Sequence, residues 1–231
     1  MSERTIIVSG GTGGLGTAVV GELLTGGWHV VVPWVVEEEL SRLPQSDRLT
    51  LIEADLFDEE QVRAVVAEAA RHDDRPLGAA VNLVGGFAMG ERVADTPISE
   101  FDRLLRLNLH PLYLLTQHAL PALVRAGGGS IVGVSAKAAF APFSGASGYI
   151  TSKAAVCAFL GAVAAEYSRD GIRANTILPS VIDTPGNRST QPDSSRDGWV
   201  SPAQIASTVA FLVSDAASAV TGAQVPVPGV G

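Results

Sequence analysis

A tyrosine and a lysine four residues apart, Tyr149 and Lys153, are the side chains of this sequence best suited to acid–base chemistry. Residues four apart on an α-helix share a face, so the phenol and the ammonium are expected side by side. A free phenol titrates near pH ~10, and a neighbouring cation favours the phenolate and lowers its pKa toward neutrality. Such a pair can act as general acid or base. A Tyr and a Lys on one helix face are more often a plain surface pair. A second motif is therefore needed to support a catalytic role for Tyr149 and Lys153.

That second motif is the glycine-rich segment Ser9-Gly-Gly-Thr-Gly-Gly-Leu-Gly16, which follows an apolar run and opens a helical pattern. Backbone N–H groups at a helix N-terminus favour anions, and glycine removes the side chains that would block a pyrophosphate. No Lys-Ser or Lys-Thr follows, which excludes a nucleoside-triphosphate P-loop. A tight turn that binds no ligand is the alternative. The residues expected to contact a dinucleotide here are Gly10, Thr12, Gly13, Gly14, Leu15 and Gly16.

The elements that must position these motifs follow an alternating pattern. Short apolar runs alternate with longer segments of helical period, which predicts parallel strands joined by crossover helices. The fold class is therefore α/β, a seven-stranded doubly wound parallel sheet with helices on both faces, in a single domain spanning residues 1–231. We expect strands near 5–9, 28–34, 48–53, 79–84, 130–135, 172–178 and 223–227, and helices near 14–26, 58–71, 99–126, 148–169 and 202–213.

Composition restricts the class of protein. The formal net charge of −8 argues against a nucleic-acid partner. The single cysteine, Cys157, cannot form an internal disulfide and fits a reducing cytoplasm. The short polar start Met1-Ser-Glu-Arg4 has no signal-peptide pattern, and no apolar run reaches the ~20 residues needed to span a bilayer. The histidines do not cluster with carboxylates or Cys157, so no metal site is expected. We expect a cytoplasmic protein without membrane or nucleic-acid partners.

Several ordered motifs give the chain a resemblance to the short-chain dehydrogenases/reductases. They are the glycine loop, Asp55-Leu56, Asn82-Leu-Val-Gly85-Gly86, Asn108, Tyr149-x-x-x-Lys153, Pro179-Ser-Val-Ile-Asp-Thr184-Pro185 and Val220-Thr-Gly222. The resemblance implies a Rossmann fold and an NAD(P)-dependent oxidoreductase. Such an enzyme would transfer hydride between the nicotinamide of NAD(H) or NADP(H) and a small carbonyl or alcohol substrate. It also implies a homodimer or homotetramer. The apolar stretches Leu112-Tyr-Leu-Leu115 and Ala154–Leu160 favour such an interface.

The resemblance also implies a role for each matched residue. Tyr149 would exchange a proton with the substrate oxygen. Lys153 would hold the nicotinamide ribose and lower the pKa of Tyr149, and Asn108 would support a water in the proton relay. The residues implied to line the cofactor cleft are Asp55 at the adenine, Asn82 and Gly85 at the floor, Ile182 and Thr184 at the carboxamide, and Leu56, Val84 and Pro179 beside them.

One departure from the family pattern concerns a serine. The hydroxyl that usually bonds the substrate carbonyl is replaced by Ala136, and the neighbouring Ser135 points to the opposite face unless the strand end is irregular. Ser135 is therefore either catalytic or a strand-end hydroxyl bonded to backbone. The quinonoid dihydropteridine reductases, which the segments Gly85–Gly90 and Ala136–Ala139 resemble, work without this serine. Such a reductase is an alternative function.

A second departure concerns cofactor choice. Trp34 stands where NAD-specific members place an Asp, and no Lys or Arg occurs from Trp28 to Ser41. Three acids, Glu37–Glu39, follow the strand, and Arg42 lies beyond them. A 2′-phosphate needs a cation within reach. We therefore predict a modest NAD(H) preference, with Trp34 packing against the adenosine.

One polar segment, residues 185–198, is rich in Gly, Pro, Ser and Asp and is predicted to be a mobile loop. It follows the sixth expected strand, at the sheet edge where ligands bind, so we interpret it as a substrate lid. An inert surface connection is the alternative. A non-catalytic dinucleotide sensor, whose lid docks a partner protein, remains the alternative function of another class.

Overall fold

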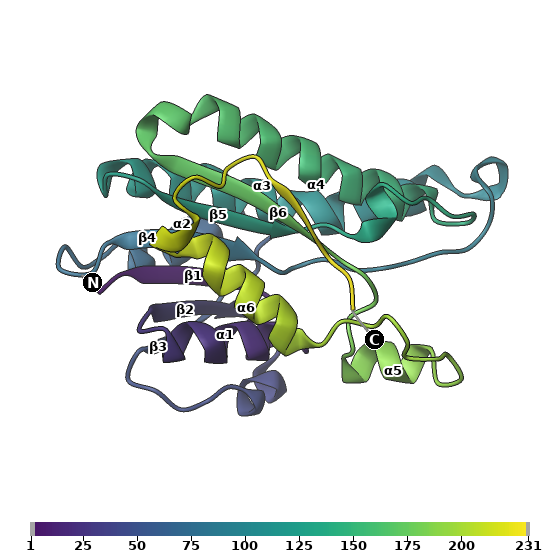
Figure 1. Cartoon of the computed structure of the whole chain (residues 1–231), viewed down its shortest axis with the longest axis horizontal. Coiled ribbons are helices and arrows are strands. Elements are labelled where there is room, and N and C mark those ends of the chain that lie inside the picture. Colours follow the sequence, from purple (N-terminus) through teal and green to yellow (C-terminus); the bar gives the residue numbers. More distant parts are fainter. Residues whose placement is uncertain (1–2, 230–231) are drawn as a thin grey trace.

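The computed structural model of the chain describes residues 3–229, which form one parallel sheet in the order β3-β2-β1-β4-β5-β6-β7 (Figure 1). Every neighbouring pair of strands is parallel. The strands are β1 (Thr5–Ser9), β2 (His29–Trp34), β3 (Leu49–Glu53), β4 (Leu77–Asn82), β5 (Gly129–Val134), β6 (Ile172–Pro179) and β7 (Gln224–Val227). The predicted α/β fold class and the seven strands are confirmed.

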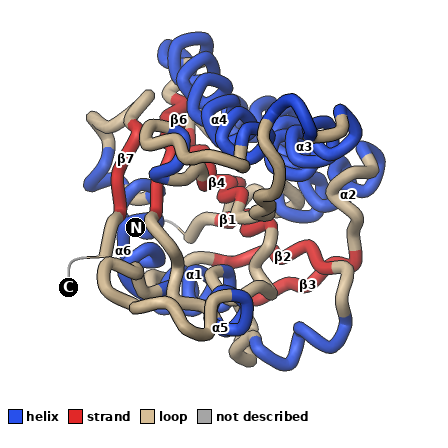
Figure 2. The backbone as a smooth tube through the Cα atoms, turned by 90° about the vertical axis from the view of Figure 1, so that its right-hand side faces the viewer, coloured by secondary structure: helices blue, strands red, loops and turns tan. Residues whose placement is uncertain are grey.

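Helices cover both faces of the sheet. They are α1 (Gly16–Thr25), α2 (Glu59–Ala69), α3 (Ile98–Arg125), α4 (Ser147–Glu166), α5 (Pro185–Thr190) and α6 (Pro202–Val213). Figure 2 shows α2, α3 and α4 on one side and α1 and α6 on the other. Adjacent residues of β1 confirm this, because Ile7 packs in the cluster with α2, α3 and α4, whereas Ile6 packs in the cluster with α1 and α6.

The strand order explains why distant motifs meet. β1 lies between β2 and β4, so the chain reverses its winding direction at this point. In open α/β sheets, ligands bind outside the carboxyl ends of the strands at such a switch point. The loops that follow β1, β4, β5 and β6 therefore share one edge of the sheet. These loops carry the glycine segment, the Asn82 segment, Ser135 and the Pro179 segment.

The two apolar helices that we expected at an interface are used mainly inside the chain. Leu112, Leu115 and Leu160 are fully buried against the sheet. Within the two stretches Tyr113 is half-exposed, with its ring 5.4 Å from that of Phe159, and Ala158 is exposed. α4 also has the length and apolar composition of a membrane-spanning helix, contrary to our expectation. A core helix passes the same test, and α4 packs on the sheet as one.

The predicted lid is only partly a loop. Its first residues form the short helix α5, Pro185–Thr190, which begins at the N-cap Thr184. Two hydrogen bonds of 2.6 and 2.8 Å join Arg188 to Asp183 across the start of this helix. The irregular connection is therefore confined to residues after Thr190, and the expectation of a loop over all of 185–198 is wrong in its first half.

Candidate active site

The glycine loop has a conformation that side chains would disrupt. Gly10 has a φ of +72°, and a Cβ added there would lie 3.1 Å from the backbone of Leu83 and Val84. A Cβ on Gly16 would overlap the carbonyl oxygen of Gly10. α1 starts directly after the loop, and Leu15 at its N-cap makes no side-chain cap bond. The loop thus offers a smooth backbone surface and uncapped amides, which fit a dinucleotide pyrophosphate.

Tyr149 and Lys153 lie on the first turns of α4, as the spacing predicts. Lys153 Nζ donates to the carbonyl oxygen of Val134 at 3.0 Å and lies 6.0 Å from the centre of the Tyr149 ring. Burial lowers the pKa of Lys153 to about 8, with the nearby Cys157 thiol opposing that shift. Burial raises the pKa of Tyr149 to about 12. The expectation that Lys153 lowers the pKa of Tyr149 is therefore wrong for this structure, because desolvation dominates at that separation.

Asn108 anchors the loop after β4 to α3. Its side chain is buried, and its Oδ1 accepts from the N–H of Gly86 at 3.0 Å. Its Nδ2 donates to Gly86 O at 3.1 Å and to Ser152 Oγ at 3.0 Å. A Cβ on Gly85 would lie 2.6 Å from Asn108 Oδ1 and 3.0 Å from Lys153 Nζ. The side chains of Asn108 and Lys153 therefore meet at the backbone of Gly85, where a side chain on residue 85 would not fit.

Ser135 is placed by the structure as a structural hydroxyl. Its side chain is 2% exposed, and its Oγ donates to the carbonyl oxygen of Lys153 at 2.6 Å. This bond holds the strand end against α4. Strand alternation continues through Ser135, since its N–H still bonds Ile177 of β6, so Ala136 takes the opposite face. Of the two interpretations of Ser135, the backbone-bonded one is correct, and we remove Ser135 from the catalytic set.

The loops after β1 and β4 are joined by Asn82. Its Oδ1 accepts from Ser9 Oγ at 2.6 Å, and its Nδ2 donates to the carbonyl oxygen of Val84 at 3.2 Å. Leu56 is buried in a small cluster with Val84. Asp55 is exposed, and its Oδ1 accepts from the N–H of Phe57 at 2.9 Å. These residues lie at the carboxyl ends of β1, β3 and β4, where the sequence places the cleft.

The segment after β6 closes over the glycine loop. Pro179 ends β6, and Ile182 forms a parallel bridge with Val200. Thr184 accepts from the N–H of Asn187 at 3.3 Å and so begins α5. A Cβ on Gly14 would lie 3.0 Å from the Cβ of Thr184. The short distance places Thr184 directly over the glycine loop.

Glu39 contacts the glycine loop, a role that sequence reasoning missed. Its Oε2 accepts from Thr12 Oγ1 at 2.7 Å. Arg42 pairs with Glu39 at 3.1 Å and donates to the carbonyl oxygen of Thr12 at 3.4 Å. We expected Arg42 to lie beyond the three acids, and this is wrong. The 3₁₀ helix Glu37–Arg42 folds back and brings Arg42 to the glycine loop. Trp34 ends β2 just before this turn and is partly buried.

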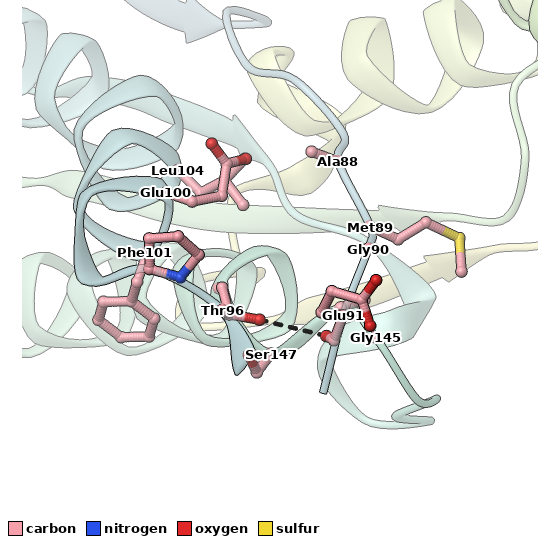
Figure 3. Close-up of a pocket in the computed structure, with 13 residues that line it drawn as sticks. Ala88, Met89, Gly90, Glu91, Thr96, Glu100, Phe101, Leu104, Gly145 and Ser147 are labelled. Atoms are coloured by element: carbon pink, nitrogen blue, oxygen red, sulfur yellow. Dashed lines mark hydrogen bonds between the residues drawn. The ribbon is translucent and has the colours of Figure 1, made fainter. Parts of the chain in front are cut away.

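A hollow lies between the loop after β4 and the starts of α3 and α4 (Figure 3). Its lining includes Met89, Glu91, Phe101 and Leu104. The hydroxyl of Thr96 donates to Glu91 O at 3.2 Å across its edge (Figure 3). Tyr149, Lys153 and the glycine loop are not among its lining residues. The hollow therefore lies at the start of α4, next to Tyr149 in the sequence, and the glycine loop does not line it.

A doubly wound parallel sheet with a glycine loop at its switch point has the architecture of the Rossmann dinucleotide-binding proteins. The family model described as "short chain dehydrogenase" matches residues 4–195, and the chain belongs to this family. The quinonoid dihydropteridine reductase branch is not shown by these matches.

Two relatives and one solved structure illustrate the similarity. The chain is 30% identical to a 2-(R)-hydroxypropyl-CoM dehydrogenase of Xanthobacter autotrophicus, over 98% of both chains. It is 31% identical to a cis-4-hydroxycyclohexanecarboxylate dehydrogenase of Sinomonas cyclohexanicum, over 99% of this chain and 96% of the relative. A short-chain type dehydrogenase/reductase of Mycobacterium ulcerans superposes with a TM-score of 0.89 at 26% identity, covering 97% of this chain and 88% of the other.

Proposed function

We propose that the protein is a nicotinamide-dinucleotide-dependent oxidoreductase that interconverts a carbonyl and an alcohol on a small substrate. The observation that carries this proposal is the meeting of Lys153 and Asn108 at Gly85, with the Tyr149 ring centre 6.0 Å from Lys153 Nζ, at the edge that holds the glycine loop. The two relatives described above are dehydrogenases named for hydroxylated substrates, which supports the same class of reaction.

The residues of this chain bind the dinucleotide, orient the groups of the site and supply a proton to the substrate. The dinucleotide supplies the hydride when bound. Gly10 lets the glycine loop pack against the backbone of Leu83 and Val84, and Gly14 lets Thr184 approach the loop. The loop amides at the start of α1 would hold the pyrophosphate. Tyr149 holds its proton at neutral pH because burial raises its pKa to about 12, so its hydroxyl donates to the substrate oxygen during reduction. Lys153 supplies the positive charge beside it, and Asn108 positions the loop after β4.

An assay of dinucleotide oxidation tests this proposal. Purified protein is incubated with NADH or NADPH and a panel of ketones and aldehydes, while dinucleotide binding is followed by tryptophan fluorescence. We expect turnover of at least one carbonyl substrate. Dinucleotide binding without turnover of any substrate would contradict the proposal and support the sensor.

A dihydropteridine-type reductase is a second candidate, favoured by the inward bond of Ser135, which leaves Ala136 in the position of the usual hydroxyl. A conjugated quinonoid ring needs less polarisation than an isolated carbonyl. Quinonoid dihydropterin therefore belongs in the same panel. Its exclusive turnover would establish this second candidate.

The rate of carbonyl reduction is expected to fall above pH ~8 as Lys153 loses its proton. Below this value Tyr149 and Lys153 are both protonated, so kcat/KM is level. Lys153→Arg keeps a cation of pKa above ~12 and should remove the alkaline decline while lowering the overall rate. Cys157→Ala is the control, because its thiol lies beside Lys153. A decline that persists in the Arg variant, or disappears with Cys157→Ala, contradicts this assignment.

We propose that the protein has a modest preference for NADH and that Glu39 is its cause. A carboxylate at Thr12 can accept from a ribose 2′-hydroxyl and repels a 2′-phosphate, which carries about −1.5 to −2 charges. Glu39→Gln should shift the ratio of dissociation constants toward NADPH by roughly tenfold at low salt, since it also frees Arg42. Fluorescence titration measures this ratio. Glu37→Gln removes the same charge two residues away and should leave the ratio unchanged; equal shifts in both variants contradict the role of Glu39.

We further propose a homodimer or homotetramer assembled through α3 and α4. Tyr113 and Phe159 remain as the apolar side chains on this surface that the sheet does not bury. Light scattering at micromolar concentration is expected to give a multiple of the chain mass. Tyr113→Asp should lower that mass by adding a charge to the interface. A monomer in the unmodified protein contradicts this proposal.

A further inference from the structure

Three aromatic rings extend in a row from the proposed proton donor toward solvent. The Phe87 ring meets the Tyr149 ring edge-on, with centres 4.9 Å apart and planes at 87°. The Phe143 ring follows at 6.5 Å from Phe87, tilted by 45°. Phe87 is 55% exposed and Phe143 is 45% exposed. Both phenylalanines thus keep much of their surface in water beside the reacting hydroxyl.

The row is held in place by the backbone. Phe87 lies in the loop after β4, whose first residues are fixed by the bonds between Asn108 and Gly86. Phe143 lies in the loop after β5. The N–H of Gly90 donates to the carbonyl oxygen of Gly145 at 2.8 Å and joins the two loops. The rings are therefore presented by a pre-formed wall, which lowers the entropy lost when a ligand packs on it.

The two segments that carry the row are apolar, and the charged residues Glu91, Arg92 and Asp95 line a hollow that Phe143 also borders. Residues 83–90 and 138–149, which carry the row, contain no Asp, Glu, Lys or Arg. Met89 and Phe140 on the same two loops are also exposed. Exposed apolar side chains gathered near Tyr149 are suited to bind a ligand. A charged ligand would find no partner on these segments, whereas an uncharged ring would bury the exposed parts of Phe87 and Phe143.

We propose that Phe87 and Phe143 bind a flat, uncharged ring of the substrate and direct the carbonyl attached to it toward the Tyr149 hydroxyl. This inference rests on the proposed carbonyl–alcohol chemistry and adds the substrate class, a cyclic and largely apolar ketone or its alcohol. Rings prefer edge-on or offset contacts with other rings, and such pairs favour binding beyond the area that they bury. The Phe87 ring, already edge-on to Tyr149, leaves its outer part free for that contact.

The test compares two uncharged ketones of equal carbon number, the aromatic acetophenone and the open-chain 2-octanone, with the dinucleotide-loaded protein. Binding is measured by ligand-observed NMR and turnover by dinucleotide oxidation. We expect acetophenone to bind more tightly and to have the higher kcat/KM. Phe87→Leu keeps an apolar side chain but removes the flat face, so it should reduce the acetophenone-to-octanone ratio by about three- to tenfold. Phe143→Leu should reduce it in the same direction.

The matched control is Phe211→Leu, which changes a phenylalanine of 46% exposure on α6, and it should leave the ratio unchanged. Equal binding of both ketones, or an unchanged ratio in Phe87→Leu, overturns the inference and leaves the proposed function standing. Ring binding that depends on Phe87, without turnover of any carbonyl, supports the ring site and overturns the proposed function instead.

Discussion

Replacing Tyr149 with phenylalanine is expected to lower kcat/KM by ~10²–10⁴-fold, the range that a positioned general acid contributes. The substitution removes only the hydroxyl that we propose as the proton donor. The ring remains, so the edge-on contact with Phe87 at 4.9 Å is retained and the site keeps its shape. Dinucleotide affinity should stay nearly unchanged. Steady-state kinetics with the best substrate of the panel, together with fluorescence titration of the dinucleotide, measure the two quantities separately.

A Phe variant that keeps more than about a tenth of kcat/KM would show that another group supplies the proton. A variant that loses both turnover and dinucleotide affinity would indicate damage to the site. Thermal unfolding of the variant and of the unmodified protein separates that outcome from loss of the acid.

A methyl group at Gly85 is expected to lower kcat/KM by about 100-fold, because displacement of catalytic groups by about 1 Å can cost that much. The added Cβ would lie 2.6 Å from Asn108 Oδ1 and 3.0 Å from Lys153 Nζ. Both groups must then move, although neither is mutated. Circular dichroism should show an intact fold, since Gly85 lies in a loop and not in the sheet.

The control for Gly85→Ala is Gly161→Ala, on α4, where an added Cβ meets no atom within 4 Å. Alanine is also the better helix former, so this variant should be at least as stable as the unmodified protein and fully active. Full activity of Gly85→Ala would contradict the convergence of Asn108 and Lys153 at this point.

The sheet could be predicted from the sequence because each strand is an apolar run between turn residues, and the strand ends found differ from those expected by at most two residues. The helix Pro185–Thr190 was missed because its composition is that of a loop. Its local signal was nevertheless present, since Thr184 is a good N-cap and Pro185 is favoured in the first helical turn.

The parts of the site that escaped prediction depend on contacts between distant segments. Three consecutive acids follow β2, and only the path of the 3₁₀ helix decides that Glu39 reaches Thr12. The pKa of Tyr149 depends on burial to which Phe87 contributes from another loop. Ser135, in contrast, was limited to two interpretations by strand alternation, and one hydrogen bond distinguishes them.

The bond between Gly90 and Gly145 has a consequence for changing the specificity of this enzyme class by loop exchange. Gly145 has a φ of +80°, and a side chain there would meet the carbonyl oxygen of Gly90, so each loop is shaped to fit the other. If the loop after β4 alone were replaced by that of a homologue, it would no longer fit the unchanged loop after β5. Chimeras should therefore exchange the loops after β4 and β5 together, because each loop fits only its own partner.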